Sequence, residues 1–138
     1  MILHRITTVL ALALIAPAAF AQDEAPGGLS LELNALSDEG GACRMTFLAT
    51  NATGADIEGA VFETVIFDVE GAVERLTLFD FRDLPVGRPR VRQFDLGGLA
   101  CADVGRVLIN GAQSCEGADG ACADGLRLSS RVDVELLG

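Results

Sequence analysis

The residues of this chain whose type and spacing could do chemistry are four cysteines, separated by 57, 13 and 6 residues: Cys43, Cys101, Cys115 and Cys122. Zinc sites combine cysteines in close C-x₂₋₄-C pairs, and thioredoxin-like redox sites need C-x-x-C. Neither spacing occurs here. In an oxidising compartment, four cysteines in a small domain are typical of two disulfides, and three pairings satisfy the count. The sequence therefore predicts structural cross-links.

Acidic and glycine residues surround the last two cysteines, in the stretch SCEGADGAC over residues 114–122. Carboxylate oxygens suit Ca²⁺, and Glu116, Asp119 and Asp124 could supply them. Calcium loops usually offer closely alternating ligands, D-x-[DN]-x-[DN]-G, whereas gaps of two and four residues separate these carboxylates. A calcium or small-ligand site in residues 115–124 is the alternative to a simple stapled loop.

Catalytic side chains are scarce, because the single histidine is His4 and the chain has no lysine, tyrosine or tryptophan. Once the N-terminal segment is removed, no histidine base, lysine Schiff base or tyrosine acid can operate. A carboxylate pair could hydrolyse glycosides, but that needs a long cleft between two tuned acids, for which about 110 residues leave little room. We expect a non-catalytic protein that uses no cofactor.

Two other features could bind a partner. Arg88, Arg90 and Arg92 project from one side if their segment is extended, and arginine forks suit carboxylates and anionic glycans. The alternative is that these arginines pair with the protein's own acids or protect an edge strand. The second feature is Phe79 and Phe81, which share a face near a strand end and form either core packing or a hydrophobic docking patch.

Residues 1–21 have the pattern of a secretory signal peptide. His4 and Arg5 precede an apolar run, and residues 19–21 form an A-x-A cleavage site. One arginine follows His4 where a twin-arginine signal has two, so we expect the general secretory route and a periplasmic or secreted protein, with retained anchoring by this segment as the alternative. After cleavage, no segment is apolar and long enough to span a bilayer.

The charge balance is acidic, with ten arginines against 20 acidic residues and a net charge of −10. Cleavage of the signal peptide removes Arg5 and makes the net charge of the remaining chain more negative. Such a surface repels nucleic acid and anionic membranes, so we expect no nucleic-acid partner. The exported part divides into a flexible lead, residues 22–28, and a single domain, residues 29–138.

Period-2 alternation dominates residues 29–138, most clearly in the last predicted strand, residues 126–136. We expect about seven strands, at residues 29–34, 43–49, 57–67, 72–81, 90–96, 106–110 and 126–136. Short strands separated by turn signals predict an all-β, antiparallel β-sandwich. The long hairpin should supply most of its core, through Val61, Phe62, Val65, Ile66, Phe67, Leu76, Leu78 and Phe79.

Residues 51–97 resemble the bacterial FxLYD type of immunoglobulin-like domain. That family shows an N-x-[ST]-G turn, an aromatic residue followed by Asp, a glycine turn, and a later L-x-P-G with a downstream Phe. The matching residues are Asn51, Thr53, Gly54, Phe67, Asp68, Gly71, Leu84, Pro85, Gly87 and Phe94, with Val86 inserted before Gly87. Phe67 stands where the family's name has Tyr. The resemblance implies an immunoglobulin-like fold and an extracytoplasmic interaction module, and it transfers no catalytic residue.

Residues 76–111 read LTLFDFRDLPVGRPRVRQFDLGGLACADVGRVLING. On this segment the whole exported part resembles short bacterial proteins labelled "Tat pathway signal sequence domain" proteins, a label that carries no function. In a sandwich of this order the second strand runs antiparallel to the fifth. Cys43 should then meet Cys101, which leaves Cys115 to pair with Cys122.

We expect a non-catalytic binding or accessory module whose partner is an unidentified periplasmic or envelope protein, engaged through an edge strand or the arginines.

Overall fold

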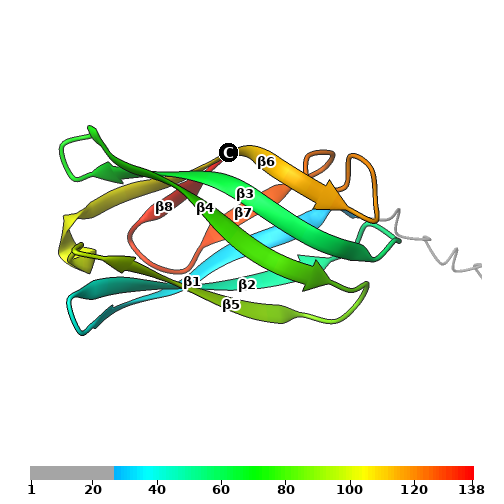
Figure 1. Cartoon of the computed structure of the whole chain (residues 1–138), viewed down its shortest axis with the longest axis horizontal. Coiled ribbons are helices and arrows are strands. Elements are labelled where there is room, and N and C mark those ends of the chain that lie inside the picture. Colours follow the sequence, from blue (N-terminus) through cyan, green and yellow to red (C-terminus); the bar gives the residue numbers. More distant parts are fainter. Residues whose placement is uncertain (1–26) are drawn as a thin grey trace, which may run out of the picture.

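The computed structural model describes residues 27–138, which form two packed four-stranded sheets (Figure 1). The predicted signal peptide and residues 22–26 of the predicted lead lie outside the described residues. In sheet order the strands are β5-β2-β1-β7 and β4-β3-β6-β8, here called sheet A and sheet B. Their bounds are β1 Leu29–Glu39, β2 Ala42–Asn51, β3 Ile57–Asp68, β4 Val73–Leu84, β5 Arg90–Gly97, β6 Val104–Glu116, β7 Arg127–Ser130 and β8 Glu135–Leu137. The predicted immunoglobulin-like β-sandwich is confirmed.

The strands form where side chains alternate between apolar and polar. β2 shows this most regularly, since every second residue from Cys43 to Asn51 is buried and the others are half-buried. β1 is longer than predicted because a bulge after Leu33 lets it continue beside β2 to Glu39. The turn that follows uses Gly40 and Gly41 at φ 54° and 85°, a conformation that side chains with a Cβ rarely adopt.

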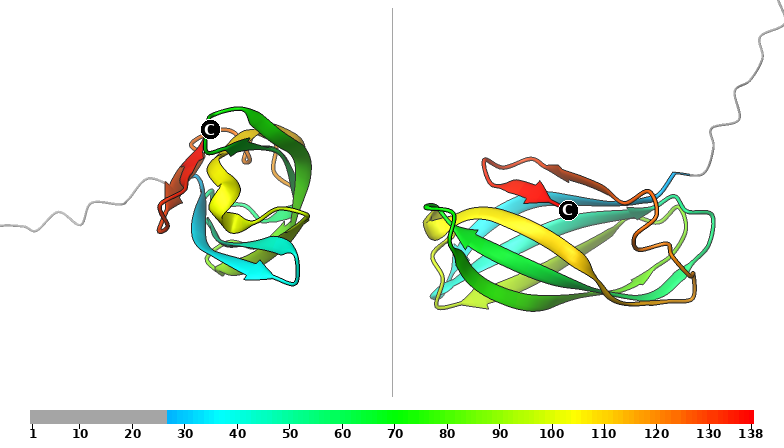
Figure 2. Two further views of the ribbon diagram at one scale, coloured as in Figure 1. Left: turned by 90° about the vertical axis from the view of Figure 1, so that its left-hand side faces the viewer. Right: turned by 90° about the horizontal axis from the view of Figure 1, so that it is seen from above.

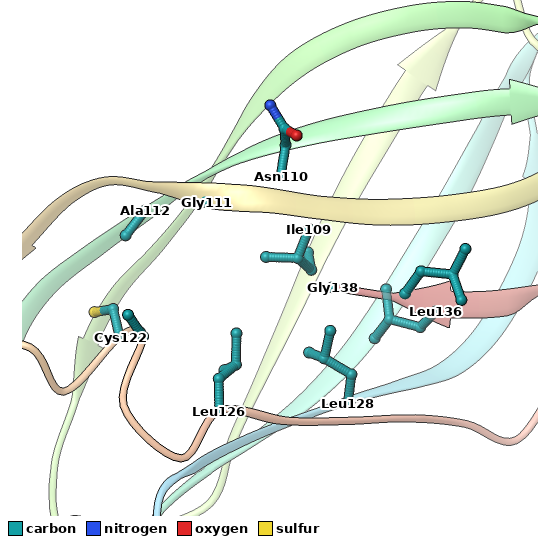
Figure 3. A pocket seen from close by; sticks show the side chains of 11 residues that line it. Ile109, Asn110, Gly111, Ala112, Cys122, Leu126, Leu128, Leu136 and Gly138 are labelled. Atoms are coloured by element: carbon teal, nitrogen blue, oxygen red, sulfur yellow. The ribbon is translucent and has the colours of Figure 1, made fainter.

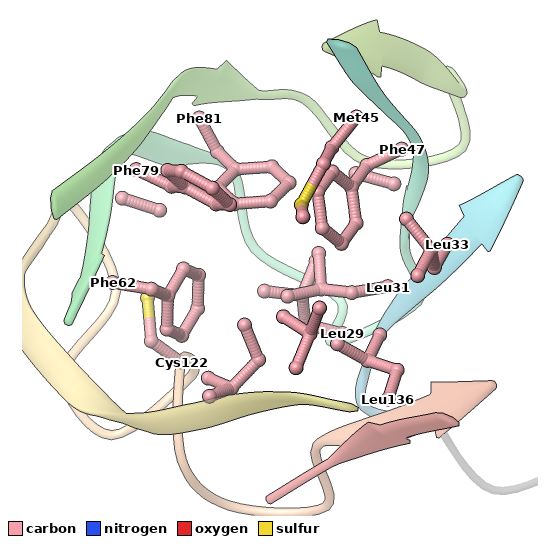
Figure 4. Packing of buried hydrophobic residues seen from close by; sticks show 14 of the residues in the cluster. Leu29, Leu31, Leu33, Met45, Phe47, Phe62, Phe79, Phe81, Cys122 and Leu136 are labelled. Atoms are coloured by element: carbon pink, nitrogen blue, oxygen red, sulfur yellow. The ribbon is translucent and has the colours of Figure 1, made fainter. Parts of the chain in front are cut away.

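Five phenylalanines and a row of leucines fill the space between the sheets (Figure 4). Phe79 stacks on Phe94 with ring centroids 4.1 Å apart, and Phe47 meets Phe79 and Phe81 edge to face. Phe79 and Phe81 are only 1% and 0% exposed. They belong to the core, so the hydrophobic docking patch that they could have formed does not exist.

The long hairpin of β3 and β4 contributes only one of its faces to this core. Phe62, Ile66 and Phe79 point inward as predicted. Leu76 and Leu78, which were also expected in the core, are 58% and 47% exposed. The sheet face opposite the core is therefore unusually apolar.

The last predicted strand is split into β7 and β8, which belong to different sheets (Figure 2). Ser130 Oγ donates to the Val134 carbonyl oxygen at 2.6 Å and accepts from the Val132 N–H at 3.3 Å. These local hydrogen bonds to a side chain replace the backbone hydrogen bonds between strands, so the chain reverses direction at residues 131–134. β7 then runs parallel to β1, and β8 runs parallel to β6. The prediction of a single strand over residues 126–136 was therefore wrong, and the otherwise antiparallel sandwich contains two short parallel pairs.

Both predicted disulfides are present. Cys43 on β2 joins Cys101, which begins the 3₁₀ turn Cys101–Asp103, with Cα atoms 4.9 Å apart. Cys115 on β6 joins Cys122, with Cα atoms 6.0 Å apart. By loop entropy, such links stabilise a fold by roughly 4 and 2.5 kcal/mol respectively. In the described residues, no helix is long and apolar enough to cross a membrane.

The predicted lead ends before Gly28, which is already part of the fold. Gly28 is buried and accepts a hydrogen bond from the Ala52 N–H at 3.2 Å. A Cβ at this position would lie 1.9 Å from the Gly125 carbonyl oxygen. Glycine is therefore required where the chain enters the sandwich.

Candidate functional site

A pocket of about 560 Å³ opens at one side of the sandwich, where β6 loses its outer neighbour (Figure 3). β8 pairs with β6 only from Arg106 to Leu108, although β6 continues to Glu116. In the described chain no other strand pairs with that side of β6. We call this opening the seam pocket, and its lining includes Ile109, Gly111, Ala112, Leu126, Leu128 and Leu136.

The walls of the seam pocket come from both sheets. Ile109 of β6 and Leu136 of β8 belong to sheet B, whereas Leu128 lies on β7 in sheet A. Figure 3 shows Leu126 and Leu128 pointing across the opening toward Ile109. Ile109 and Leu136 are 4% and 6% exposed, so the pocket reaches the edge of the hydrophobic core.

Two bulges bend β6 where it borders this pocket. The pairing with β3 skips Asn110 and Gln113, so that β6 carries two extra residues within a short stretch. Bulges are frequent at sheet edges and next to functional sites, because they interrupt one ladder and redirect the strand. Residues 110–113 are all exposed as a result.

The disulfide between Cys115 and Cys122 forms the far end of the pocket. It holds the loop after β6 against the sandwich, with Cys122 only 2% exposed and Ala121 9% exposed. Because Cys122 also lines the seam pocket, this staple limits the opening to the stretch of β6 around residues 109–112. The stretch SCEGADGAC is therefore structural in the first place.

The three arginines do not form one free stripe. Arg92 Nε donates to the Phe81 carbonyl at 2.6 Å, and Nη2 donates to the Asp83 carbonyl at 2.9 Å. The Arg92 side chain is 12% exposed, and burial lowers the pKa of its guanidinium. Arg92 thus ties β5 to β4, whereas Arg88 is exposed and Arg90 half-exposed.

The three candidate calcium ligands are not brought together. Asp119 and Asp124 line a small pocket of about 250 Å³, whereas Glu116 lines another hollow beside Arg82. Within residues 27–138, no group of three His, Cys, Asp or Glu side chains is placed to hold a metal ion. The geometry gives no support to a calcium site in this loop.

Asn51 is a buried residue whose hydrogen bonds connect several backbone segments, a role that the N-x-[ST]-G motif did not predict. It is 2% exposed, and its Nδ2 donates to the carbonyls of Leu84 at 2.7 Å and Ala55 at 2.8 Å. Its Oδ1 accepts from the N–H and the hydroxyl of Thr53, at 2.9 and 2.7 Å. The N-x-T-G turn is therefore a hydrogen-bonded link between β2 and the end of β4.

Comparison of the chain with family models, with curated proteins and with solved structures finds no match.

Proposed function

We propose that this protein is a non-catalytic, exported binding module that holds an extended segment of another envelope protein against the open edge of β6. The observation that carries the proposal is the seam pocket, where a long strand continues without an outer neighbour. An unpaired strand edge offers a row of backbone N–H and C=O groups. An extended peptide satisfies these groups by adding a strand.

β8 indicates what such a segment should look like. In β8, Leu136 points into the sandwich opposite Val107, while its neighbours face outward. Gly138 lies beside Ile109, so a segment beside residues 110–113 would continue this pattern over about 13 Å, at roughly 3.4 Å per residue. Alternate residues of the bound segment should be apolar, because Ile109, Leu126 and Leu128 line the pocket.

The opposite side of the sandwich is less suited to strand addition. There, Arg92 bridges β5 to β4 by hydrogen bonds to two backbone carbonyls. Pro89 and the charged residues beside it protect the start of β5, as is usual for edges that must not pair. The seam pocket is thus the preferred edge.

Export rests on the sequence pattern of residues 1–21, and the two disulfides agree with an oxidising compartment. The resemblance of residues 51–97 to FxLYD-type domains supports an extracytoplasmic interaction module. We thus propose export by the general secretory route, a partner in the cell envelope, and binding without catalysis.

A self-filling variant tests the proposal. The chain is extended after Gly138 by four residues, alternately polar and apolar, which can pair with β6 beyond Leu108 and occupy the pocket. The control is an extension of equal length made of glycine and serine. Both are expressed from Met1 in an exporting host, recovered from its periplasm, and used to capture envelope proteins.

We expect the native chain and the glycine–serine extension to retain the same protein, and the self-filling variant to lose at least about 90% of it, because its own strand occupies the edge. Equal retention by all three chains would show that the seam pocket is not the binding site. Retention that is lost only when Arg88 and Arg90 are changed to serine would transfer the function to these arginines.

A further inference from the structure

The face of sheet B that points away from the core carries an apolar row across all four strands. Leu137 of β8 lies opposite Leu108 of β6, which lies opposite Val65 of β3, which lies opposite Leu76 of β4. We call these four residues the apolar row. Beside it on the same face stand Leu78 and, in the next row, Phe67 opposite Val73.

Much of this surface is open to solvent in the described chain. Leu76, Leu78 and Val73 are 58%, 47% and 62% exposed, whereas Val65 at the centre is 7% exposed. A sheet with one wet face normally alternates apolar inward and polar outward. β3 is instead apolar on both faces, the pattern of a strand that is covered on both sides.

The outer face of sheet A is mostly polar, with Val91 as its one strongly exposed large apolar side chain among the described residues. There, Arg44 and Asp95 form a two-point ion pair across β2 and β5, and Gln93 donates to the Thr46 hydroxyl. The side chain of Arg44 even holds the pKa of the Asp95 carboxyl below its usual value. The contrast between the sheets indicates that the apolar row is an interface rather than general surface composition.

The polar groups beside the apolar row suit a second copy of this chain. On one side of the row, Arg106 lies over the Phe67 ring at 5.1 Å from its centroid. On the other side, Asn110 donates to the carboxylate of Glu63. A two-fold axis along the row superimposes the row on itself and exchanges its two sides. Each Arg106 then faces Asn110 of the other copy, one strand away from its Glu63.

The area of the face agrees with a reversible pair. Seven residues at roughly 3.4 Å each on β4, β3 and β6, with strands about 4.8 Å apart, and the three residues of β8 give a face of about 400 Å². Side-chain relief increases the accessible area, so that two copies should bury about 1,000 Å² in total, the lower end of specific interfaces. Association should therefore be weak and dependent on concentration.

We infer that a second copy of this chain covers the outer face of sheet B, in a two-fold dimer centred on the apolar row. The two sheets pack face to face as in a sandwich. Leu76 and Leu78 lie on β4, two strands away from the seam pocket. Leu137 and Asn110 border both this face and the seam pocket, whereas Leu76 does not line the pocket, so a change at Leu76 tests dimerisation apart from the proposed binding of an extended segment.

Sedimentation equilibrium tests the dimer. The chain is expressed from Met1, recovered from the periplasm of an exporting host, and measured from about 5 to 500 µM, a range suited to a weak interface. Leu76→Asp places a charge in the row. Val91→Asp is the matched control, because Val91 is also 58% exposed but lies on β5 in the other sheet. Circular dichroism confirms that both variants fold.

We expect the native chain and Val91→Asp to shift from monomer to dimer as concentration rises, and Leu76→Asp to associate at least about tenfold more weakly. A native chain that stays monomeric throughout, or a dimer that Leu76→Asp leaves unchanged, would overturn the inference. Arg106→Glu should weaken the dimer and the double change with Glu63→Arg should restore it. Failure of that restoration would overturn the two-fold arrangement.

Discussion

Replacing Asn51 with alanine should destabilise the fold far more than its small loss of apolar area implies. The change removes two donated and two accepted hydrogen bonds, and leaves the Leu84 carbonyl buried without its partner. Hydrogen bonds contribute about 1 kcal/mol each net, and an orphaned buried acceptor costs about 1–3 kcal/mol. Thr53 can replace its lost hydrogen bonds with bonds to water, so not all four losses count in full. We therefore expect the free energy of unfolding to fall by about 3 kcal/mol.

The measurement is urea unfolding followed by far-ultraviolet circular dichroism, since the chain has no tryptophan or tyrosine for fluorescence. For a domain of this size, 3 kcal/mol should lower the melting temperature by about 10–15 °C. The control is Asn34→Ala, which removes only a bond to Glu32 on the half-buried part of β1 and should cost about 0.5 kcal/mol or less. Equal losses for the two variants would refute the role given to Asn51.

The near-isosteric change Asn51→Asp tests the same contacts through pH. Its carboxylate would meet the carbonyl oxygens of Leu84 and Ala55, which accept but cannot donate. Burial and these oxygens should raise the pKa of the new carboxyl in the folded state. The variant should then be most stable at acidic pH and lose stability as pH rises through that raised pKa. A variant whose stability relative to the native chain does not change with pH would contradict this.

Three further results are expected. Gly28→Ala should lower the free energy of unfolding by about 2 kcal/mol or more, because a Cβ at this site clashes with backbone. Gly97→Ala should lower it by less than about 1 kcal/mol, because a Cβ there meets nothing. Equal shifts of the melting temperature for the two variants would contradict this. Arg92→Ser should lower the free energy of unfolding by about 1–2 kcal/mol, because two backbone carbonyls lose a charged donor. Arg90→Ser should leave it almost unchanged. The midpoints of urea unfolding measure both effects. Millimolar calcium should leave the melting temperature within about 1 °C, and a clear rise would restore the alternative based on residues 115–124.

Much of the fold could be predicted because alternation reports burial directly. Residues 126–136 keep the predicted alternation, with Leu136 buried and Arg127 exposed. The break between β7 and β8 could not be predicted, since it depends on the hydrogen bonds of Ser130 and on which sheet each half joins. The disulfides followed from the order of the strands alone.

The surfaces were harder to predict, for a physical reason. β3 is apolar at both parities, so the sequence cannot indicate whether Phe62 or Val65 faces the core. Phe62 packs against Phe81, which in turn packs against Phe47 of sheet A; these contacts turn Phe62 inward and leave the apolar row outside. The seam pocket depends on the shortness of β8 and on two bulges in β6, which are properties of register rather than composition.

The most direct test of the proposed function is photo-cross-linking in the envelope. A photoreactive side chain replaces Ala112, which is exposed and lines the seam pocket, or Ala102, an exposed alanine in the 3₁₀ turn, as a matched control. We expect position 112 to capture one protein through a short extended segment with alternating apolar residues, and position 102 not to capture it. Cross-links of equal yield at both positions, or none at position 112, would contradict it.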